Sequence, residues 1–466
     1  MKITKTDVLW NYIATFFKIS STALLLPVIL HKLPSEQVGI WTVFSSIAAL
    51  VFLVDFGFNS SFSRNVTYIF SGVRSLKTVG HEISFDNKEI DYNLLKGLLG
   101  SMRWFYSRVS IVIFLILATS GSYYMSRLLI NYHGDKTNVY IAWFLFIAIN
   151  TYDLYTLYYD ALLEGRGLIK ISQKITILGH VVYLLIATIA IYLGFGLIAL
   201  VLAQLISIII IRNISQKQFF TPKIVFNLNK SENHDKRSVL KSIYPNAVKY
   251  GVTSLGGFMI QKSSIFIGSL YLPLSAIASF GIAKQMMDIT VSIAAISVAT
   301  FLPQIANLRV EGDYERIKNI CIKGIIIIAN IIFIMGASFI ILFGGIILHL
   351  IKSNTALNEQ LLLIVGISSL IGLNSGISGA IISTRNHISF VKPSLLSGIA
   401  TVILLLLFFK FTSLGLLGMA ITPGLIDSCY QGWKWPSVVI KEFNIKISDF
   451  FKVAKNLNFS SLFKRT

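Results

Sequence analysis

Residues 249–288 read KYGVTSLGGFMIQKSSIFIGSLYLPLSAIASFGIAKQMMD, and this stretch decides the fold. Its apolar runs predict two membrane helices, Tyr244–Leu270 and Ala276–Thr300, joined by a short turn that contains a proline. Each helix carries a lysine eight residues from its end at the turn, Lys262 in the first helix and Lys284 in the second. At about 1.5 Å per residue, both ammonium groups lie roughly 12 Å from the helix ends at the turn. Because a charge at that depth is costly in hydrocarbon, the pair predicts a polar, cationic cavity inside a helical membrane protein.

The composition of the whole chain agrees with a multi-pass membrane protein. Hydrophobic residues make up 54% of the 466 residues and charged residues only 13%, and the mean hydropathy is +0.71. The net charge of +20 does not indicate nucleic-acid binding, because the basic residues avoid the apolar runs and collect in alternate loops. That asymmetry predicts that both termini are cytoplasmic and that no nucleic acid is a partner.

Apolar runs long enough to cross a bilayer recur along the chain. The predicted spans are Trp10–Leu30, Val38–Phe62, Trp104–Ile130, Val139–Leu162, Ile175–Leu193, Leu197–Ile214, Tyr244–Leu270, Ala276–Thr300, Cys321–Phe343, Leu361–Ser383, Leu395–Phe409 and Ser413–Tyr430. The predicted fold class is therefore an all-α membrane protein of about 12 transmembrane helices.

Short internal matches indicate two halves of similar architecture. Leu33-Pro34 follows the first span as Leu272-Pro273 follows the seventh, although matches this short can also arise by chance. We predict two pseudo-symmetric six-helix bundles around a central cavity, as in two-bundle transporters. The predicted parts are an N-terminal bundle at 1–214, a basic cytoplasmic linker at 215–242, a C-terminal bundle at 243–431 and a cytoplasmic tail at 432–466.

The tail alternates apolar and basic residues at helical spacing. Its apolar positions are Ile440, Phe443, Ile447, Phe450 and Phe451, opposite Lys441, Lys446, Lys452 and Lys455. This pattern predicts an amphipathic helix on the anionic inner leaflet. The alternative is an irregular basic tail.

No sequence signature of an enzyme or of a bound cofactor is present. Cys321 and Cys429 lie in or beside apolar runs and lack the paired spacing of a metal site. The chain has no Walker A sequence and no Gly-x-Ser-x-Gly elbow. We therefore expect no cofactor, no metal and no direct ATP drive.

Acidic residues within the predicted spans are candidates for ion coupling, because a carboxyl group can take up a proton on one side of the membrane and release it on the other. They are Asp55, Asp153, Asp160, Asp288 and Asp427. Asp153 and Asp160 share a face of the fourth span with several tyrosines, including Tyr155 and Tyr159, which could bind sugar hydroxyls. The alternative is an interfacial Asp160 and a belt of aromatic side chains. Asp427 could instead partner a lysine across the bundle or lie near the inner interface.

Basic residues in or near the spans are candidates for binding an anion. They are Lys18, Lys262, Lys284, Arg64 and Lys249. The strongest alternative for Lys284 is an ion pair with Asp288, four residues further along its helix, which needs no ligand. Lys262 has no acidic residue on its own predicted helix, so it is a stronger candidate for binding an anion than Lys284. Arg64 and Lys249 could snorkel to the inner surface or form an entry site for a phosphate headgroup.

Several stretches resemble the Wzx-type O-antigen and polysaccharide flippases, which belong to the multidrug/oligosaccharidyl-lipid/polysaccharide exporter superfamily. The similar stretches are LPVIL at 26–30, VGIW at 38–41, LVDFG at 53–57, SFSRN at 61–65 and LEGRG at 163–167. They are concentrated in the first half of the chain, whereas the length and the predicted topology agree throughout.

This resemblance implies two helical bundles that open alternately and move an undecaprenyl-diphosphate-linked oligosaccharide from the inner to the outer leaflet of a bacterial cytoplasmic membrane. It implies a cationic lumen, for which Lys18, Lys262 and Lys284 are the candidates by position. The acidic groups of the fourth span do not follow from it. We expect membrane lipids, a polysaccharide polymerase and a chain-length regulator as further partners, and a monomeric protein.

Three alternatives to a polysaccharide flippase compete. A small-molecule antiporter of the same architecture needs an acidic, cation-selective cavity, whereas Lys262 favours an anionic cargo. A membrane polymerase or ligase needs catalytic groups on a large extracytoplasmic loop, and every predicted outer loop is short. A membrane scaffold without transport activity leaves the buried lysines unexplained.

Overall fold

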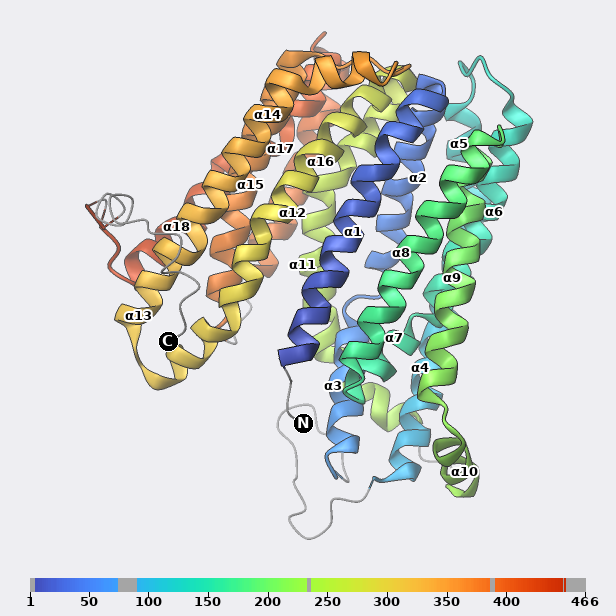
Figure 1. Ribbon diagram of the computed structural model, residues 1–466, viewed down its shortest axis with the longest axis vertical. Coiled ribbons are helices and arrows are strands. Elements are labelled where there is room, and N and C mark those ends of the chain that lie inside the picture. Colours follow the sequence, from blue (N-terminus) through green and yellow to red (C-terminus); the bar gives the residue numbers. More distant parts are fainter. Residues whose placement is uncertain (1–4, 74–89, 233–235, 386–389, 447, 450–466) are drawn as a thin grey trace. The chain divides into compact units, whose positions relative to one another are not determined.

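The computed structural model describes residues 5–73, 90–232, 236–385, 390–446 and 448–449, and these residues form helices joined by turns, with no strand (Figure 1). The prediction of an all-α fold is confirmed. The chain divides into two compact units, Met1–Ser254 and Leu255–Thr466, which we call unit 1 and unit 2. Each unit is described by itself.

Unit 1 holds the helices that precede residue 255. They are α1 (Lys5–Lys32), α2 (Ser35–Leu53), α3 (Phe58–Phe70), α4 (Tyr92–Ile116), a π-helical turn (Leu117–Gly121), α5 (Ser122–Leu128), α6 (Lys136–Thr156), α7 (Tyr158–Gly165), α8 (Ile169–Tyr192), α9 (Leu197–Phe219), α10 (Pro222–Lys230) and the first part of α11 (Lys236–Tyr271). Helix α8 packs between α1 and α9, α3 packs on α7, and α6 packs on α4 and α9 (Figure 1).

Unit 2 begins within α11. Its other helices are α12 (Leu274–Glu311), α13 (Tyr314–Asn319), a π-helical segment (Ile320–Ile327), α14 (Ile328–Leu350), α15 (Glu359–Ser383), α16 (Val391–Phe411), α17 (Gly415–Cys429) and α18 (Gln431–Glu442). Helix α15 packs on α12, α17 and α18. The predicted turn between the two lysine-bearing helices is confirmed, since α11 ends at Tyr271 and α12 begins at Leu274.

Nine helical segments of the described residues are long and apolar enough to cross a membrane, and they coincide with nine of the predicted spans. The other three predicted spans fall on α6 with α7, on α11 and on α17. Helix α17 is only 15 residues long, and the helix that contains Asp153 is interrupted at Leu157. Most of the predicted amphipathic tail, from 450 onward, lies outside the described residues.

The second predicted span, Val38–Phe62, is wrong as a single helix. The chain leaves helical geometry between α2 and α3, where Phe56 and Gly57 both take positive φ angles, 49° and 72°. Asp55 lies in this turn, and its carboxylate accepts a hydrogen bond from the backbone N–H of Asn59 at 3.2 Å. The carboxylate therefore satisfies an amide in the first turn of α3 that has no partner within the helix.

Two glycine substitutions test the positive φ angle at this break. Gly57→Ala should destabilise the protein by about 1 kcal/mol, because a side chain disfavours a φ of 72°. Gly257→Ala, within helix α11, should be neutral or stabilising, since a Cβ there meets no atom within 4 Å. Thermal unfolding of the detergent-solubilised variants measures both effects. An equal response of the two variants would contradict the assigned strain.

In unit 2, a cluster of ionic side chains fixes α18 to α12 and to the turn that follows α15. Glu442 Oε1 accepts hydrogen bonds from Arg309 Nη1 at 2.6 Å and from Arg385 Nε at 3.0 Å. Burial raises the pKa of Glu442, but the hydrogen bonds and positive charges of Arg385 and Arg309 outweigh it, so the pKa lies below its usual 4.5. The ion cluster therefore holds the end of the last described helix against its unit.

The lowered pKa of Glu442 gives this cluster a defined pH dependence. Its contribution to stability is complete above pH 4.5 and is lost as the pH falls through the lowered folded-state value. We expect Glu442→Gln to lower stability by about 1–3 kcal/mol at neutral pH, and the difference from the unchanged protein to shrink below pH 4.5. Melting temperatures measured from neutral pH to below pH 4.5 test this pH dependence, with Glu359→Gln, at an exposed position, as the control. A difference that stays constant with pH would overturn the assignment.

Candidate functional site

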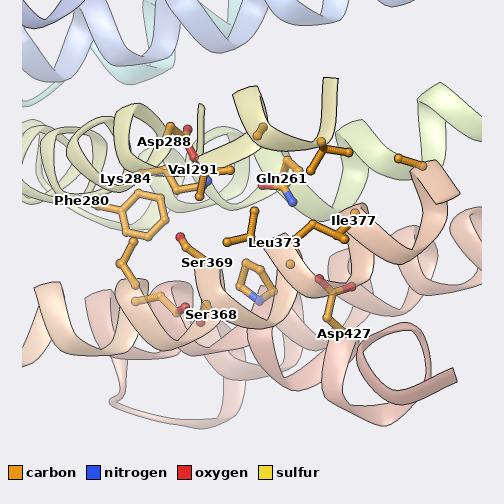
Figure 2. Close-up of a pocket in the computed structure, with 18 of the residues that line it drawn as sticks. Gln261, Phe280, Lys284, Asp288, Val291, Ser368, Ser369, Leu373, Ile377 and Asp427 are labelled. Atoms are coloured by element: carbon orange, nitrogen blue, oxygen red, sulfur yellow. Dashed lines mark hydrogen bonds and ion pairs between the residues drawn. The ribbon is translucent and has the colours of Figure 1, made fainter. Parts of the chain in front are cut away.

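Unit 2 contains a cavity of about 480 Å³ between α11, α12, α15 and α17. Its apolar wall includes Phe280, Leu373 and Ile377 (Figure 2). Its polar and charged side chains are those of Gln261, Lys284, Asp288, Ser368, Ser369 and Asp427. The structure thus brings three of the predicted candidates, Lys284, Asp288 and Asp427, to one cavity within a single unit. The predicted cationic character of this cavity is wrong, because its lining holds two aspartates and one lysine and does not include Lys262.

Lys284 and Asp288 form the ion pair that their spacing allows, with the ammonium donating to Asp288 Oδ1. Lys262 lies half-buried on α11, outside the residues that line the cavity, and interacts electrostatically with both members of the pair. Over the described ranges, no carboxylate lies within ion-pair distance of Lys262 and it makes no hydrogen bond through its side chain. Two ammonium groups therefore share one carboxylate, and one positive charge is left over.

Asp427 is the second unpaired charge among the candidate residues of unit 2. It lies on α17, is 6% exposed, and its carboxylate makes no hydrogen bond or ion pair with any residue that the structure describes. Figure 2 shows the carboxylate pointing into the cavity. A Cβ built on Gly372 would lie 3.7 Å from Asp427 Oδ2 and 3.9 Å from Gln261 Nε2, so both groups approach the bare backbone of this glycine. The site can therefore accept a proton or another hydrogen-bond donor.

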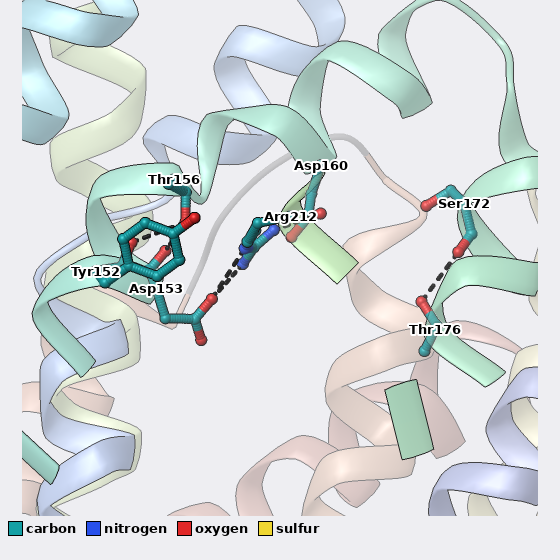
Figure 3. A network of polar contacts seen from close by, with 7 residues as sticks. All are labelled: Tyr152, Asp153, Thr156, Asp160, Ser172, Thr176 and Arg212. Atoms are coloured by element: carbon teal, nitrogen blue, oxygen red, sulfur yellow. Dashed lines mark hydrogen bonds and ion pairs between the residues drawn. The ribbon is translucent and has the colours of Figure 1, made fainter. Parts of the chain in front are cut away.

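In unit 1, one arginine binds both aspartates of the fourth predicted span. Arg212 of α9 reaches Asp153 through Nη2 at 2.5 Å and Nε at 3.0 Å, and Asp160 through Nη1 at 2.7 Å (Figure 3). The expected proximity of the two aspartates on one side of the helix is confirmed, although the helix breaks between them at Leu157. Arg212 is 5% exposed. The sequence did not single it out, because it lies at the end of the predicted span Leu197–Ile214, where a basic side chain usually reaches the membrane interface.

Arg212, Asp153 and Asp160, which we call the Arg212 cluster, border a cavity of unit 1 of about 590 Å³. Glu164 and His180 also line it, and His180 Nδ1 lies 3.4 Å from Ser21 Oγ. The lining holds three carboxylates but only one arginine, so it is acidic where the chain as a whole is basic. Across the residues described by the structure, no group of three or more His, Cys, Asp or Glu is arranged to hold a metal ion.

Three further candidates of unit 1 are held by packing or lie outside its cavity. Asp55 is 8% exposed, and its Oδ1 accepts a hydrogen bond of 2.6 Å from Tyr106 Oη. The ring of Tyr159 lies 4.5 Å from that of Tyr158, within a buried aromatic cluster. Tyr155 is 38% exposed and lines a groove outside the cavity.

The remaining basic candidates do not line either cavity. Lys18 on α1 and Arg64 on α3 are exposed, although Lys18 interacts electrostatically with His180. Lys249 belongs to α11, and its side chain lies outside the described residues. The predicted set of cations therefore does not converge on one point within a unit.

Solved structures of membrane transporters share this fold. An inward-facing multidrug resistance MATE family transporter of the MOP superfamily is similar over 92% of this chain and 95% of its own, with a TM-score of 0.61 and 15% identity. The lipid II flippase MurJ in an inward closed conformation is similar over 96% and 90%, with a TM-score of 0.64 and 15% identity. An outward-facing MATE family transporter matches over 96% and 100%, with a TM-score of 0.54 and 17% identity.

Comparisons of the sequence with protein-family models and with curated proteins found no match. At 15–17% identity the structural similarity shows the fold alone. The protein is a multi-pass membrane protein with the fold of MOP superfamily transporters. That fold hosts both the MurJ flippase and the multidrug transporters, so function has to be argued from the site.

Replacing Arg212 should strongly destabilise the protein, and replacing its two aspartate partners as well should recover part of the lost stability. Arg212→Met should cost about 3–5 kcal/mol, because it leaves the buried Asp153 and the half-buried Asp160 without a cation. Adding Asp153→Asn and Asp160→Asn should recover part of that loss, since the amides need no counter-charge. Thermal unfolding in detergent measures the series, with the exposed Arg127→Met as control. A triple variant no more stable than Arg212→Met alone would contradict this charge balance.

Proposed function

We propose that the protein is a flippase for an undecaprenyl-diphosphate-linked oligosaccharide, the precursor of an O-antigen, capsule or exopolysaccharide. In this proposal it works by alternating access in a bacterial cytoplasmic membrane, with both termini in the cytoplasm. The observation that carries the proposal is the ammonium group of Lys262, which lies near the Lys284–Asp288 ion pair and has no carboxylate of its own within ion-pair distance among the described residues. A polymerase and a chain-length regulator would then act on the delivered unit.

The diphosphate of such a lipid is an anion that the ammonium groups of Lys262 and Lys284 could bind. An anion that leaves water needs fixed positive charge or hydrogen-bond donors in place of its hydration shell. Lys262 can offer its ammonium without breaking an ion pair, and Lys284 can exchange Asp288 for a phosphate oxygen. Lys18, Arg64 and Lys249 are assigned to earlier contacts along the path, and Tyr155 and Tyr159 to the sugar region, as hypotheses from sequence.

Ion coupling is assigned to the carboxylates that are free to change their protonation. Asp427 faces the unit 2 cavity without a partner, and Asp288 becomes free if a phosphate takes Lys284. Asp55, Asp153 and Asp160 are engaged by Tyr106 or Arg212, so protonation of any of them disrupts a bond that holds the fold. We therefore rank Asp427 first among the five predicted coupling residues.

A second candidate function is export of small organic cations by an antiporter of the same superfamily. The observation that favours it is the acidic lining of the unit 1 cavity, with Asp153, Asp160 and Glu164 against Arg212. The two functions differ in the charge of the cargo. A flippase depends on Lys262, whereas a cation exporter does not and is helped by its removal.

The flippase proposal predicts that Lys262→Met strongly slows transport without unfolding the protein. One charge-assisted contact is worth about 1.5–3 kcal/mol, so transport should fall by about tenfold or more. The assay follows a fluorescently labelled polyprenyl-diphosphate sugar across vesicles that contain the purified protein. The matched control is Lys410→Met, which removes an exposed lysine outside the cavity.

The same vesicles separate the two candidate functions. Proton-driven uptake of a cationic dye that survives Lys262→Met, together with no movement of the labelled lipid, would reject the flippase and support the antiporter. Movement of the labelled lipid that is equal in Lys262→Met and Lys410→Met would reject the role of Lys262.

A further inference from the structure

A groove runs along the outside of unit 1, away from its interior cavity. Its first part has a volume of about 740 Å³ and lies between α4, the end of α9 and α10. Its second part, of about 480 Å³, lies between α4 and α6. Ser107 and Tyr155 line both parts, so the two are continuous.

The first part of the groove is basic. Lys96 and Arg103 line it from α4, and no Asp or Glu is among the described residues of its wall. Lys96 Nζ donates a hydrogen bond of 2.6 Å to the backbone oxygen of Ser231, and Arg103 lies 5.8 Å from the centroid of the Phe220 ring. Neither cation has a carboxylate within ion-pair distance in the part of the chain that the structure describes. Both are therefore available to an anion.

The second part of the groove is apolar. Ile111 and Phe114 of α4 line it at 55% and 44% exposure, and Ala148 of α6 lies opposite them. From Arg103 to Phe114 the helix rises by about 16 Å, which matches the roughly 15 Å half-thickness of a bilayer's hydrocarbon core. One groove thus leads from two cations to an apolar channel one leaflet deep.

Residues beside the basic part are those that favour a membrane interface. Trp104 lines this part and is 51% exposed, and indole rings are enriched at the headgroup level. Helix α10 packs on α4 and is amphipathic, with Phe226 58% exposed and Lys230 Nζ 4.1 Å from the centre of its ring. The basic part therefore lies at headgroup level and the apolar part within the hydrocarbon.

We propose that this groove is a binding site for one anionic phospholipid, with the phosphate on Arg103 and Lys96 and an acyl chain between α4 and α6. An anionic headgroup should bind more tightly than a zwitterionic one, because a zwitterionic headgroup brings its own positive charge toward the two basic side chains. None of the groove residues lines the unit 1 cavity or the unit 2 cavity. Tyr155, which the transport proposal assigns to the sugar region, also lines the groove, so the variants that test the lipid site leave Tyr155 unchanged.

Native mass spectrometry of the purified full chain tests the site with palmitoyl-oleoyl phosphatidylglycerol as the probe. We expect Arg103→Gln to weaken binding by about tenfold, through loss of a charge-assisted contact. Ala148→Phe should weaken it by filling the acyl channel. Arg108→Gln removes an exposed arginine of the same helix that does not line the groove, and it should leave binding unchanged.

Three comparisons complete the test. Phosphatidylcholine should bind more weakly than phosphatidylglycerol to the unchanged protein, and equal binding would overturn the proposal. Glycerol phosphate should fail to displace the lipid; displacement would show a site for free phosphate instead. Phosphatidylglycerol brominated on the part of its acyl chain next to the headgroup should quench the fluorescence of the unchanged protein more than that of Trp104→Phe, and equal quenching would also overturn the proposal.

Discussion

The main physical constraint on this protein is that removing a charged side chain from water is energetically unfavourable. A charged side chain among membrane helices has to find a counter-charge or a hydrogen-bond donor, or face a polar cavity. Arg212 binds Asp153 and Asp160, and Asp55 takes the hydroxyl of Tyr106. These pairs join different helices, so they fix the packing of unit 1 while they satisfy its charges.

Apolar run length was enough to predict the fold class, but not the two interruptions of the helices. Nothing in the run Val38–Phe62 reports that Asp55 will accept the amide of Asn59 and the hydroxyl of Tyr106, because Tyr106 is distant in sequence. The break at Leu157 lies between Asp153 and Asp160, which are held together by an arginine from α9. Breaks that depend on tertiary partners are invisible to a local pattern.

The candidate site was predictable to the extent that it follows from helical spacing. Lys284 and Asp288 are four residues apart, and their ion pair is confirmed. Spacing could not tell which charges stay unpaired, since that depends on the side chains of neighbouring helices. Among the candidate residues that the structure describes, Asp427 and Lys262 of unit 2 are unpaired, whereas Asp153 and Asp160 of unit 1 are paired.

The two unpaired groups of unit 2 have opposite charge, and this has a thermodynamic consequence for any coupled transport. An anion bound by Lys262 removes the surplus positive charge, and a proton on Asp427 removes the uncompensated negative charge. Each event removes one uncompensated charge, so a conformation that excludes water from both groups is favoured most when both the anion and the proton are bound. The coupling is reciprocal: if protonation strengthens anion binding by some factor, the anion strengthens protonation by the same factor.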